Sequence, residues 1–189
     1  MTRWEPGARE RLNAAALELY ATKGFEDTTV AEIAAAAGLT ERTFFRYFTD
    51  KREVLFAGSE LLELEFVRGA GDAPADATPI EIVSAAVAAA ADFFPDDRRS
   101  YSRQRAVVIA ANPQLQEREL RKMSSLATAL TGALGERGIP EPAATLAAQS
   151  GVTVFRVSFA QWIAPGSKRA FADIAREVFG ELATMTLTQ

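Results

Sequence analysis

Side chains that can donate hydrogen bonds lie close together between residues 40 and 51. Arg42 can bridge two acceptors on the major-groove edge of guanine, whereas Thr40 and Thr43 can bond to a base or touch a thymine methyl group. Tyr47 and Lys51 can reach phosphate oxygens, which position a protein on a duplex without reading its sequence. This stretch therefore favours contact with double-stranded DNA.

A helix start is encoded just before this stretch. Thr29 is followed three positions later by Glu32, so each of the two side chains can accept a hydrogen bond from the backbone N–H of the other residue. An apolar stripe at helical spacing follows, and Gly38 allows a left-handed turn at no steric cost. We therefore expect a short helix that ends at Gly38; its stripe consists of Val30, Ile33, Ala34 and Ala37.

Thr40 is a cap for a second short helix, which we expect to have an apolar and a polar side. Two short helices joined by a tight turn form the helix-turn-helix pattern, in which the second helix lies in the major groove of DNA. The alternative is a helical hairpin with an ordinary solvated polar face. The expected inner side consists of Phe44, Phe45 and Phe48, and the outer side of Arg42, Thr43, Arg46 and Tyr47.

Residues 4–56 resemble the N-terminal domain of the tetracycline-repressor (TetR) family of transcriptional regulators. The resemblance rests on Gly24-Phe25, Thr28-Thr29, Tyr47-Phe48 and Lys51. It implies a palindromic DNA operator bound through the helix Thr40–Phe48. A tyrosine is common in that family where Phe45 stands, so this position has no hydroxyl for a DNA contact. The expected DNA-binding residues are Thr28, Thr29, Thr40, Arg42, Thr43, Arg46, Tyr47 and Lys51.

The composition excludes several classes of function. The 189 residues include no cysteine and no histidine, which removes thiolate and imidazole metal sites and Ser-His-Asp or Cys-His catalysis. The adjacent carboxylates Glu26-Asp27 and Asp96-Asp97 are typical of solvated turns, and no Gly-rich phosphate-binding loop is present. We therefore expect no catalytic residue, no metal site, no cofactor and no enzymatic activity.

The net charge of −4 is unusual for a protein that binds DNA, but positive charge is concentrated locally at Arg42, Arg46, Lys51 and Arg52. Phosphate binding depends on such local charge. No apolar run reaches the ~20 residues that span a bilayer, and the N-terminus has no signal-peptide core. We therefore expect a cytoplasmic protein without a membrane segment.

The rest of the sequence reads as helical, which predicts an all-α fold of about nine helices. Asp50 and Glu53 form another capping signature, from which we expect one continuous helix to about Gly69. The expected domains are a DNA-binding domain over residues 1–50 and a ligand-binding and dimerisation domain over residues 51–189.

The last two expected helices, from about Pro142 to Ile163 and after Gly166, are apolar on broad faces. They either complete the core or leave apolar surface for association. The family resemblance implies that they form a homodimer, which would place two recognition helices about one DNA turn apart.

The resemblance also implies a small-molecule effector among the C-terminal helices, although residues at these spacings are more often plain core. The fragment RQRAVVIAANPQL resembles regulators related to the mycofactocin regulator, some of which respond to acyl-coenzyme A. A basic cluster could hold its phosphates, or it could be a solvated face. The candidate ligand residues are Phe66, Arg103, Met123, Phe155, Phe159 and Trp162, and the basic cluster is Arg98, Arg99, Arg103, Arg105, Arg118, Arg121 and Lys122.

The sequence therefore predicts a ligand-released homodimeric repressor whose effector is acyl-coenzyme A or another hydrophobic compound. The alternative is a helical adaptor or small-molecule-binding protein that does not bind an operator.

Overall fold

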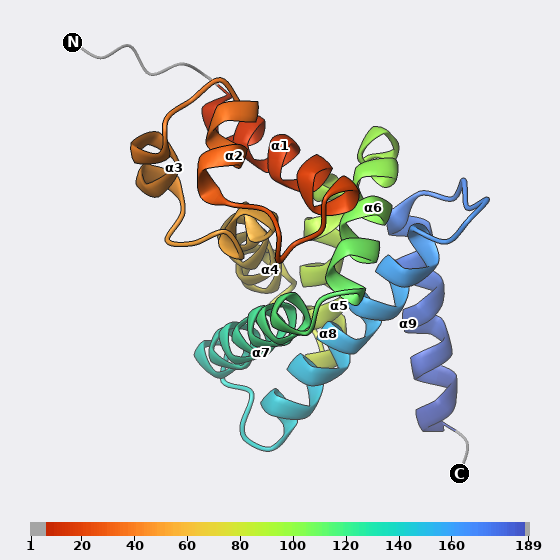
Figure 1. Cartoon of the computed structure of the whole chain (residues 1–189). Coiled ribbons are helices and arrows are strands. Elements are labelled where there is room, and N and C mark those ends of the chain that lie inside the picture. Colours follow the sequence, from red (N-terminus) through yellow and green to blue (C-terminus); the bar gives the residue numbers. More distant parts are fainter. Residues whose placement is uncertain (1–6, 188–189) are drawn as a thin grey trace. The chain divides into compact units, whose positions relative to one another are not determined.

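The computed structural model describes residues 7–187, and within this range the fold is all-α, as the sequence predicts. Figure 1 shows the nine α-helices of the described residues. They are α1 (Ala8–Thr22), α2 (Val30–Ala36), α3 (Glu41–Tyr47), α4 (Ser59–Asp72), α5 (Pro79–Ala89), α6 (Arg99–Ala110), α7 (Pro113–Glu136), α8 (Ala143–Trp162) and α9 (Phe171–Leu187). Three short 3-10 helices connect them: η1 (Glu53–Phe56), η2 (Ala90–Phe93) and η3 (Asp96–Arg98).

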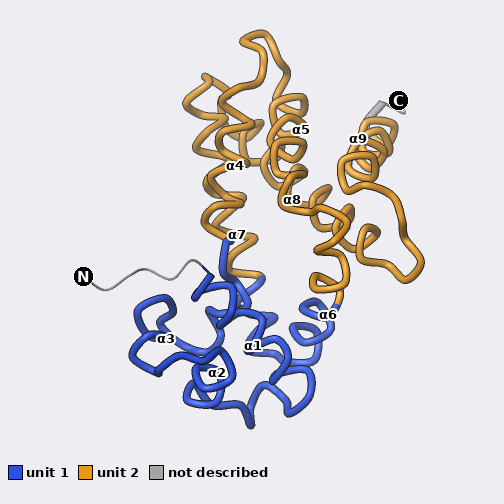
Figure 2. The backbone as a smooth tube through the Cα atoms, turned by 90° about the horizontal axis from the view of Figure 1, so that it is seen from above, with its two compact units in different colours: residues 1–58, 104–119 blue, residues 59–103, 120–189 orange. Residues whose placement is uncertain are grey.

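The chain divides into two compact units, coloured separately in Figure 2. Unit 1 comprises Met1–Gly58, of which residues 1–6 lie outside the described range, together with Gln104–Glu119. Unit 2 comprises Ser59–Arg103 and Leu120–Gln189. Helices α6 and α7 each contribute residues to both units. The division into domains at residues 50 and 51 stays a prediction.

Unit 1 is built on α1, which packs against α2 and η1. Its buried face presents Leu12, Ala16 and Tyr20 at helical spacing, and the edge of the Tyr20 ring meets the ring of Phe25 with centroids 5.1 Å apart. Ile33 from α2 and Phe44 from α3 are fully buried in this unit. A small apolar core therefore holds α2 and α3 through their inner faces.

The expected continuous helix from Asp50 to about Gly69 is wrong. Asp50 does cap the start, because its carboxylate accepts from the backbone N–H groups of Arg52 and Glu53 at 2.7 and 3.3 Å. The helical segment that follows is η1, only four residues long, and the backbone breaks at Gly58, where φ is +92°. A new helix, α4, begins at Ser59 and extends past Gly69 to Asp72. Gly58 adopts the left-handed conformation that other residues avoid, so the sequence allows a sharp break here.

The core of unit 2 lies where α5 packs against α4 and α8. Gly69 allows α4 to approach α5 closely: a Cβ atom at this position would lie 2.5 Å from the Cβ of Ala89 and 2.9 Å from the carbonyl oxygen of Ala85. α5 begins with a complete capping box formed by Thr78 and Glu81. α8 is buried along one face and also packs against α9.

In the part of the chain that the structure describes, every helix is too short or too polar to cross a membrane.

Candidate nucleic-acid interface

The turn between α2 and α3 follows local rules that the sequence shows directly. Thr29 caps α2: its hydroxyl accepts from the N–H of Glu32 at 3.2 Å, and the Glu32 carboxylate accepts from the N–H of Thr29 at 2.9 Å. Gly38 has φ +67° and ends the helix, and Thr40 then caps α3 by accepting from the N–H of Thr43 at 3.2 Å. These contacts define a helix-turn-helix.

The Glu32 carboxylate at this cap is held ionised. Lys23, directly after α1, donates to it at 2.5 Å, and both the backbone and the hydroxyl of Thr29 also donate to it. The hydrogen bond from Lys23 is the main reason that the pKa of Glu32 falls to about 2, followed by those from Thr29. The ion pair therefore ties the start of α2 to α1.

Helix α3 has a buried and an exposed side. Phe44 and Phe48 are 0% and 5% exposed and pack against each other with ring centroids 5.5 Å apart. Arg42 and Arg46 are exposed on the opposite side of the helix. Arg42 makes no hydrogen bond or ion pair within residues 7–187, so its guanidinium can bind another molecule.

Arg46 lies over the ring of Tyr47, 5.0 Å from its centroid, and donates to its hydroxyl at 3.3 Å. Tyr47 and Thr43 are half-buried along the same helix. The structure therefore brings five of the expected DNA-binding residues onto one short helix and its cap: Thr40, Arg42, Thr43, Arg46 and Tyr47. Thr29 is also exposed, at the start of α2.

Phe45 does not lie on the inner side of α3, contrary to the sequence analysis. It is 55% exposed, with its ring edge-on to Phe44 at a centroid distance of 5.5 Å. Consecutive residues are 100° apart on an α-helix, so Phe44 and Phe45 cannot both point into a narrow core. Helical geometry was the signal that could have revealed this exposed residue from sequence alone.

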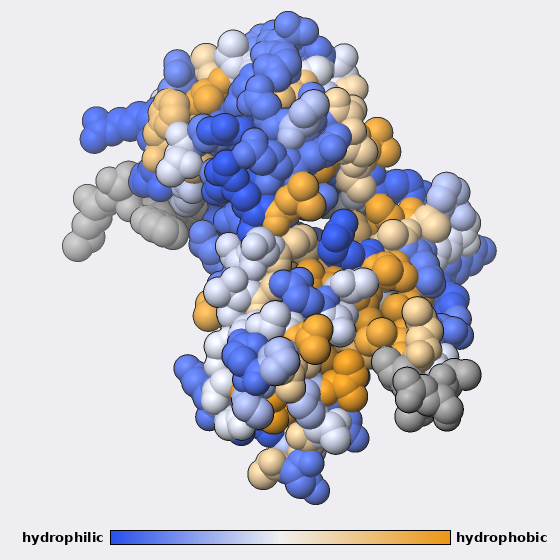
Figure 3. Space-filling model, turned by 90° about the horizontal axis from the view of Figure 1, so that it is seen from below, coloured by the Kyte–Doolittle hydropathy of each residue, from blue (hydrophilic) through white to orange (hydrophobic). Residues whose placement is uncertain are grey.

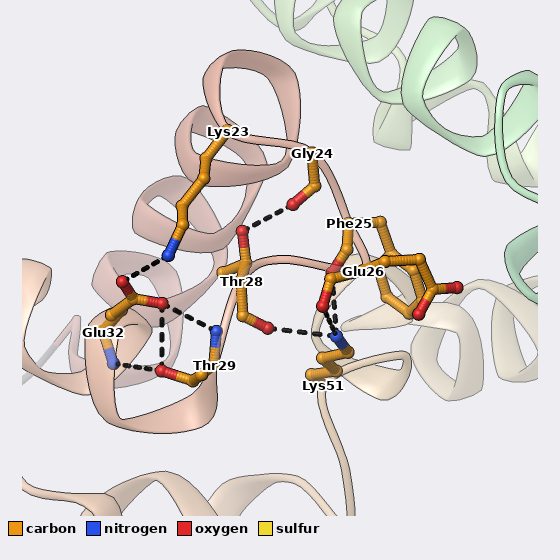
Figure 4. Close-up of polar contacts among 8 residues, drawn as sticks. All are labelled: Lys23, Gly24, Phe25, Glu26, Thr28, Thr29, Glu32 and Lys51. Atoms are coloured by element: carbon orange, nitrogen blue, oxygen red, sulfur yellow. Dashed lines mark hydrogen bonds and ion pairs between the residues drawn. The ribbon is translucent and has the colours of Figure 1, made fainter.

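The remaining two expected DNA-binding residues, Thr28 and Lys51, have their polar groups turned into unit 1 (Figure 4). Thr28 is only 1% exposed, and its hydroxyl donates to the carbonyl of Gly24 at 2.7 Å. Its side chain therefore has no surface with which to contact DNA in this conformation.

The Lys51 ammonium group donates to three backbone carbonyls, those of Phe25, Glu26 and Thr28, at 2.8, 3.0 and 3.0 Å. It also lies 4.5 Å from the centroid of the Phe25 ring. A lysine ammonium has three N–H donors, so all of them are used. Lys51 therefore fastens the segment after α3 to the turn between α1 and α2, and a phosphate contact would require these bonds to break.

Tyr20 reinforces the same connection from α1. Its hydroxyl donates to the backbone carbonyl of Lys51 at 2.6 Å, and burial raises the pKa of this phenol above its ordinary range. The Tyr20 hydroxyl therefore stays protonated and keeps donating at any physiological pH.

The candidate ligand residues on α8 lie in a packed aromatic cluster of unit 2. Phe94 is its centre, with centroid distances of 5.6 Å to Phe155, 5.6 Å to Phe159 and 5.7 Å to Trp162. Phe66 on α4 meets Phe155 edge-on at 5.3 Å. Met123 packs on the outside of the same core. These rings contact one another, as core residues do.

The arginines of the basic cluster are largely engaged with the protein itself. Arg103 donates to the carbonyls of Ile163 and Ala164 at 2.7 and 2.9 Å, at the C-terminal end of α8. Arg99 donates to the carbonyls of Ser167 and Arg169 and lies over the ring of Trp162. In unit 1, Arg105 donates to the carbonyl of Leu55 at 2.7 Å and Arg118 pairs with Glu53. These four arginines therefore have intramolecular partners that a phosphate would have to displace.

A capped helix-turn-helix with an anchored inner face and exposed arginines is the arrangement with which DNA-binding transcriptional regulators contact the major groove. Residues 77–186, more than half of the chain, match the family model of the MftR C-terminal domain, a C-terminal domain of tetR-type regulators. Residues 12–57 match the model of the tetR family of bacterial regulatory proteins, and the chain belongs to this family. These two matches confirm the resemblance drawn from the sequence.

Two curated regulators are similar over part of their length. The chain is 37% identical to the HTH-type transcriptional regulator TcmR of Streptomyces glaucescens over 78 residues, which are 41% of this chain and 34% of TcmR. It is 33% identical over 101 residues to MftR of Mycobacterium tuberculosis, a proposed regulator of mycofactocin biosynthesis, covering 53% of this chain and 50% of MftR. The matches thus span half or less of these relatives.

Among solved structures, the fold resembles that of Thermus thermophilus FadR, a TetR family transcriptional repressor in complex with lauroyl-CoA. The TM-score is 0.53 at 22% sequence identity, with 96% of each chain covered. This likeness shows the fold alone.

Proposed function

We propose that this protein is a homodimeric repressor that binds a palindromic operator through α3 and is released by a small hydrophobic ligand. The observation that carries the proposal is the exposed guanidinium of Arg42, which has no partner among the described residues, on a helix whose opposite side is buried. An arginine in this position can make bidentate contacts to guanine. On α3 and its cap, Thr40 and Thr43 would lie near the bases and Tyr47 at a phosphate. Thr29, at the start of α2, would contact a second phosphate.

Dimerisation through α8 and α9 is supported by the apolar surface of these two helices. They pack against each other, and Figure 3 shows apolar surface beside the C-terminal end of α9. Large apolar side chains are exposed on both helices: Leu146 and Val157 on α8 at 65% and 41%, and Met185 on α9 at 77%. Burial of such side chains against a second copy would be favourable.

Release by a ligand is supported by the MftR-type C-terminal domain and by the lauroyl-CoA bound to FadR. The candidate ligand residues are Phe66, Arg103, Met123, Phe155, Phe159 and Trp162. The rings pack together and Arg103 is bonded to carbonyls, so a ligand could bind among these residues only if α8 shifted. Such a shift of α8 would couple ligand binding to a change in the conformation of unit 2. A hydrophobic compound such as an acyl-coenzyme A fits the aromatic part of this site.

Binding to the DNA upstream of the reading frame of this protein, measured by fluorescence anisotropy, tests the core of the proposal. We expect Arg42→Ala to cost ~1–3 kcal/mol on the operator and to relax sequence preference. Arg68→Ala is the matched control, because Arg68 lies on α4, outside the helix-turn-helix, and pairs with Glu65 and Asp72 on its own helix. Equal losses on operator and random DNA for Arg42→Ala would contradict base reading by α3.

Light scattering tests the dimer. Val157→Glu places a charge on the exposed face of α8, so we expect a monomer at micromolar concentration, whereas Thr128→Glu on the exposed side of α7 should leave a dimer. A wild-type monomer would contradict dimerisation.

Thermal shift with and without a long-chain acyl-coenzyme A tests the ligand. A rise in melting temperature together with loss of operator binding is expected. No shift at saturating concentration would end the acyl-coenzyme A proposal.

A further inference from the structure

Phe45 is an apolar side chain in an unusual place. It is 55% exposed in the middle of α3, the helix that carries the DNA-facing arginines. Single exposed apolar residues are normal on a protein surface, but here the surface is the one that meets the major groove.

The ring of Phe45 leans against the core on one side. Its edge-on contact with Phe44, at 5.5 Å and an interplanar angle of 83°, rests it against a fully buried residue. Arg42, three positions earlier on the helix, is its neighbour on the same surface. When Arg42 bonds to the edge of a DNA base, the neighbouring part of the major groove would therefore lie against Phe45.

The major groove presents one apolar group, the C5-methyl group of thymine, to a side chain in this position. A phenyl ring has no hydrogen-bond donor or acceptor, so it cannot read any other base edge. Contact with the polar edge of cytosine, guanine or adenine would dehydrate base atoms without replacing their hydrogen bonds. The ring therefore favours thymine over the other bases at the position that it covers.

We propose that Phe45 is a specificity-determining residue that reads one thymine in each half-site through its methyl group. This inference rests on the proposed operator binding through α3. Burial of one methyl group is worth about a fourfold change in Kd for each half-site.

The experiment removes the methyl group from the DNA and the ring from the protein, separately and together. Full-length protein is used to select its preferred operator from random DNA, and each thymine of that operator is then replaced by deoxyuridine, which lacks only the methyl group. For the wild type we expect one position in each half-site at which this replacement weakens binding about fourfold. Phe45→Ala should bind the original operator more weakly and lose the sensitivity to deoxyuridine at that position.

Two further variants make the result specific. Phe45→Tyr retains the ring and should retain the sensitivity to the methyl group, whereas Arg42→Ala should lose affinity and yet keep that sensitivity. Because Phe45 is largely exposed, Phe45→Ala should melt at the wild-type temperature, and a matched melting curve shows that the variant is folded.

If Phe45→Ala and deoxyuridine weakened binding independently at every thymine, so that their fold-changes in Kd multiplied, the inference would be overturned. The proposed operator binding through α3 would still stand. The absence of any preferred sequence in the selection would overturn the proposed function and this inference together.

Discussion

Replacement of Lys51 by methionine tests whether this lysine stabilises the fold of unit 1 or contacts phosphate. The variant keeps a side chain of similar length and removes the ammonium group. Three carbonyls, those of Phe25, Glu26 and Thr28, then lose a charged donor at 2.8–3.0 Å.

The expected loss of stability follows from these contacts. A hydrogen bond from a charged donor contributes about 1.5–3 kcal/mol when it is buried. The bonds to Phe25 and Thr28 are only partly buried and the bond to Glu26 is exposed, so each is worth less than that range. A cation over a ring adds about 0.5–1 kcal/mol. Lys51→Met should therefore lower the free energy of unfolding by about 2–4 kcal/mol.

Urea unfolding followed by circular dichroism measures this loss, and Arg52→Met is the matched control. Arg52 carries the same charge one residue further on, but its side chain is half exposed and its ion pair is with the adjacent Asp50. Solvent screens an exposed pair of this kind, so Arg52→Met should lower the free energy of unfolding much less than Lys51→Met does.

The alternative role gives the opposite pattern. If Lys51 contacted a phosphate, its removal would make DNA binding less sensitive to salt. The slope of the logarithm of the association constant against the logarithm of the salt concentration would become less negative by about 0.9 per protomer. Our interpretation of Lys51 would be refuted if Lys51→Met were as stable as the wild type while its salt slope changed by this amount.

Two further predictions concern the cap of α2 and the contact of α4 with α5. Because the pKa of Glu32 is lowered from an ordinary value of 4.5 to about 2, its contribution is complete above pH 4.5 and is lost as the pH falls towards 2. The stability difference between wild type and Glu32→Gln, from acid unfolding curves, should therefore shrink across this window; a difference independent of pH would contradict the ion pair with Lys23. Gly69→Ala should lower stability by about 1–3 kcal/mol, because its Cβ would collide with the Cβ of Ala89. Gly71→Ala on the same helix has open space and should raise stability by about 0.5–1 kcal/mol; equal effects of the two changes in urea unfolding would show that close packing does not matter at Gly69.

Local rules made much of the fold, and the helix-turn-helix in particular, predictable. The caps at Thr29 and Thr40 and the turn at Gly38 depend on residues no more than four positions apart, so they can be read directly from the sequence. Periodicity similarly indicated that Phe44 and Phe48 are buried beneath the arginines. The resemblance to the TetR family indicated the functional class, a transcriptional regulator.

Residue types could not show which cations face solvent. Lys51 and Arg103 suggested contacts with phosphate, but their partners are carbonyls 23–26 and 60–61 positions away along the chain. A sequence pattern shows that a lysine can donate three hydrogen bonds without showing which acceptors lie nearby.

The sequence by itself determined the type of helical motif, the residues that begin and end its helices, and the polar character of α3. Only the tertiary structure decided that Thr28 is buried and that the backbone breaks at Gly58. The physical reason is that capping and periodicity act over one or two helical turns, whereas burial and hydrogen-bond partners depend on segments far apart in the chain that folding brings together.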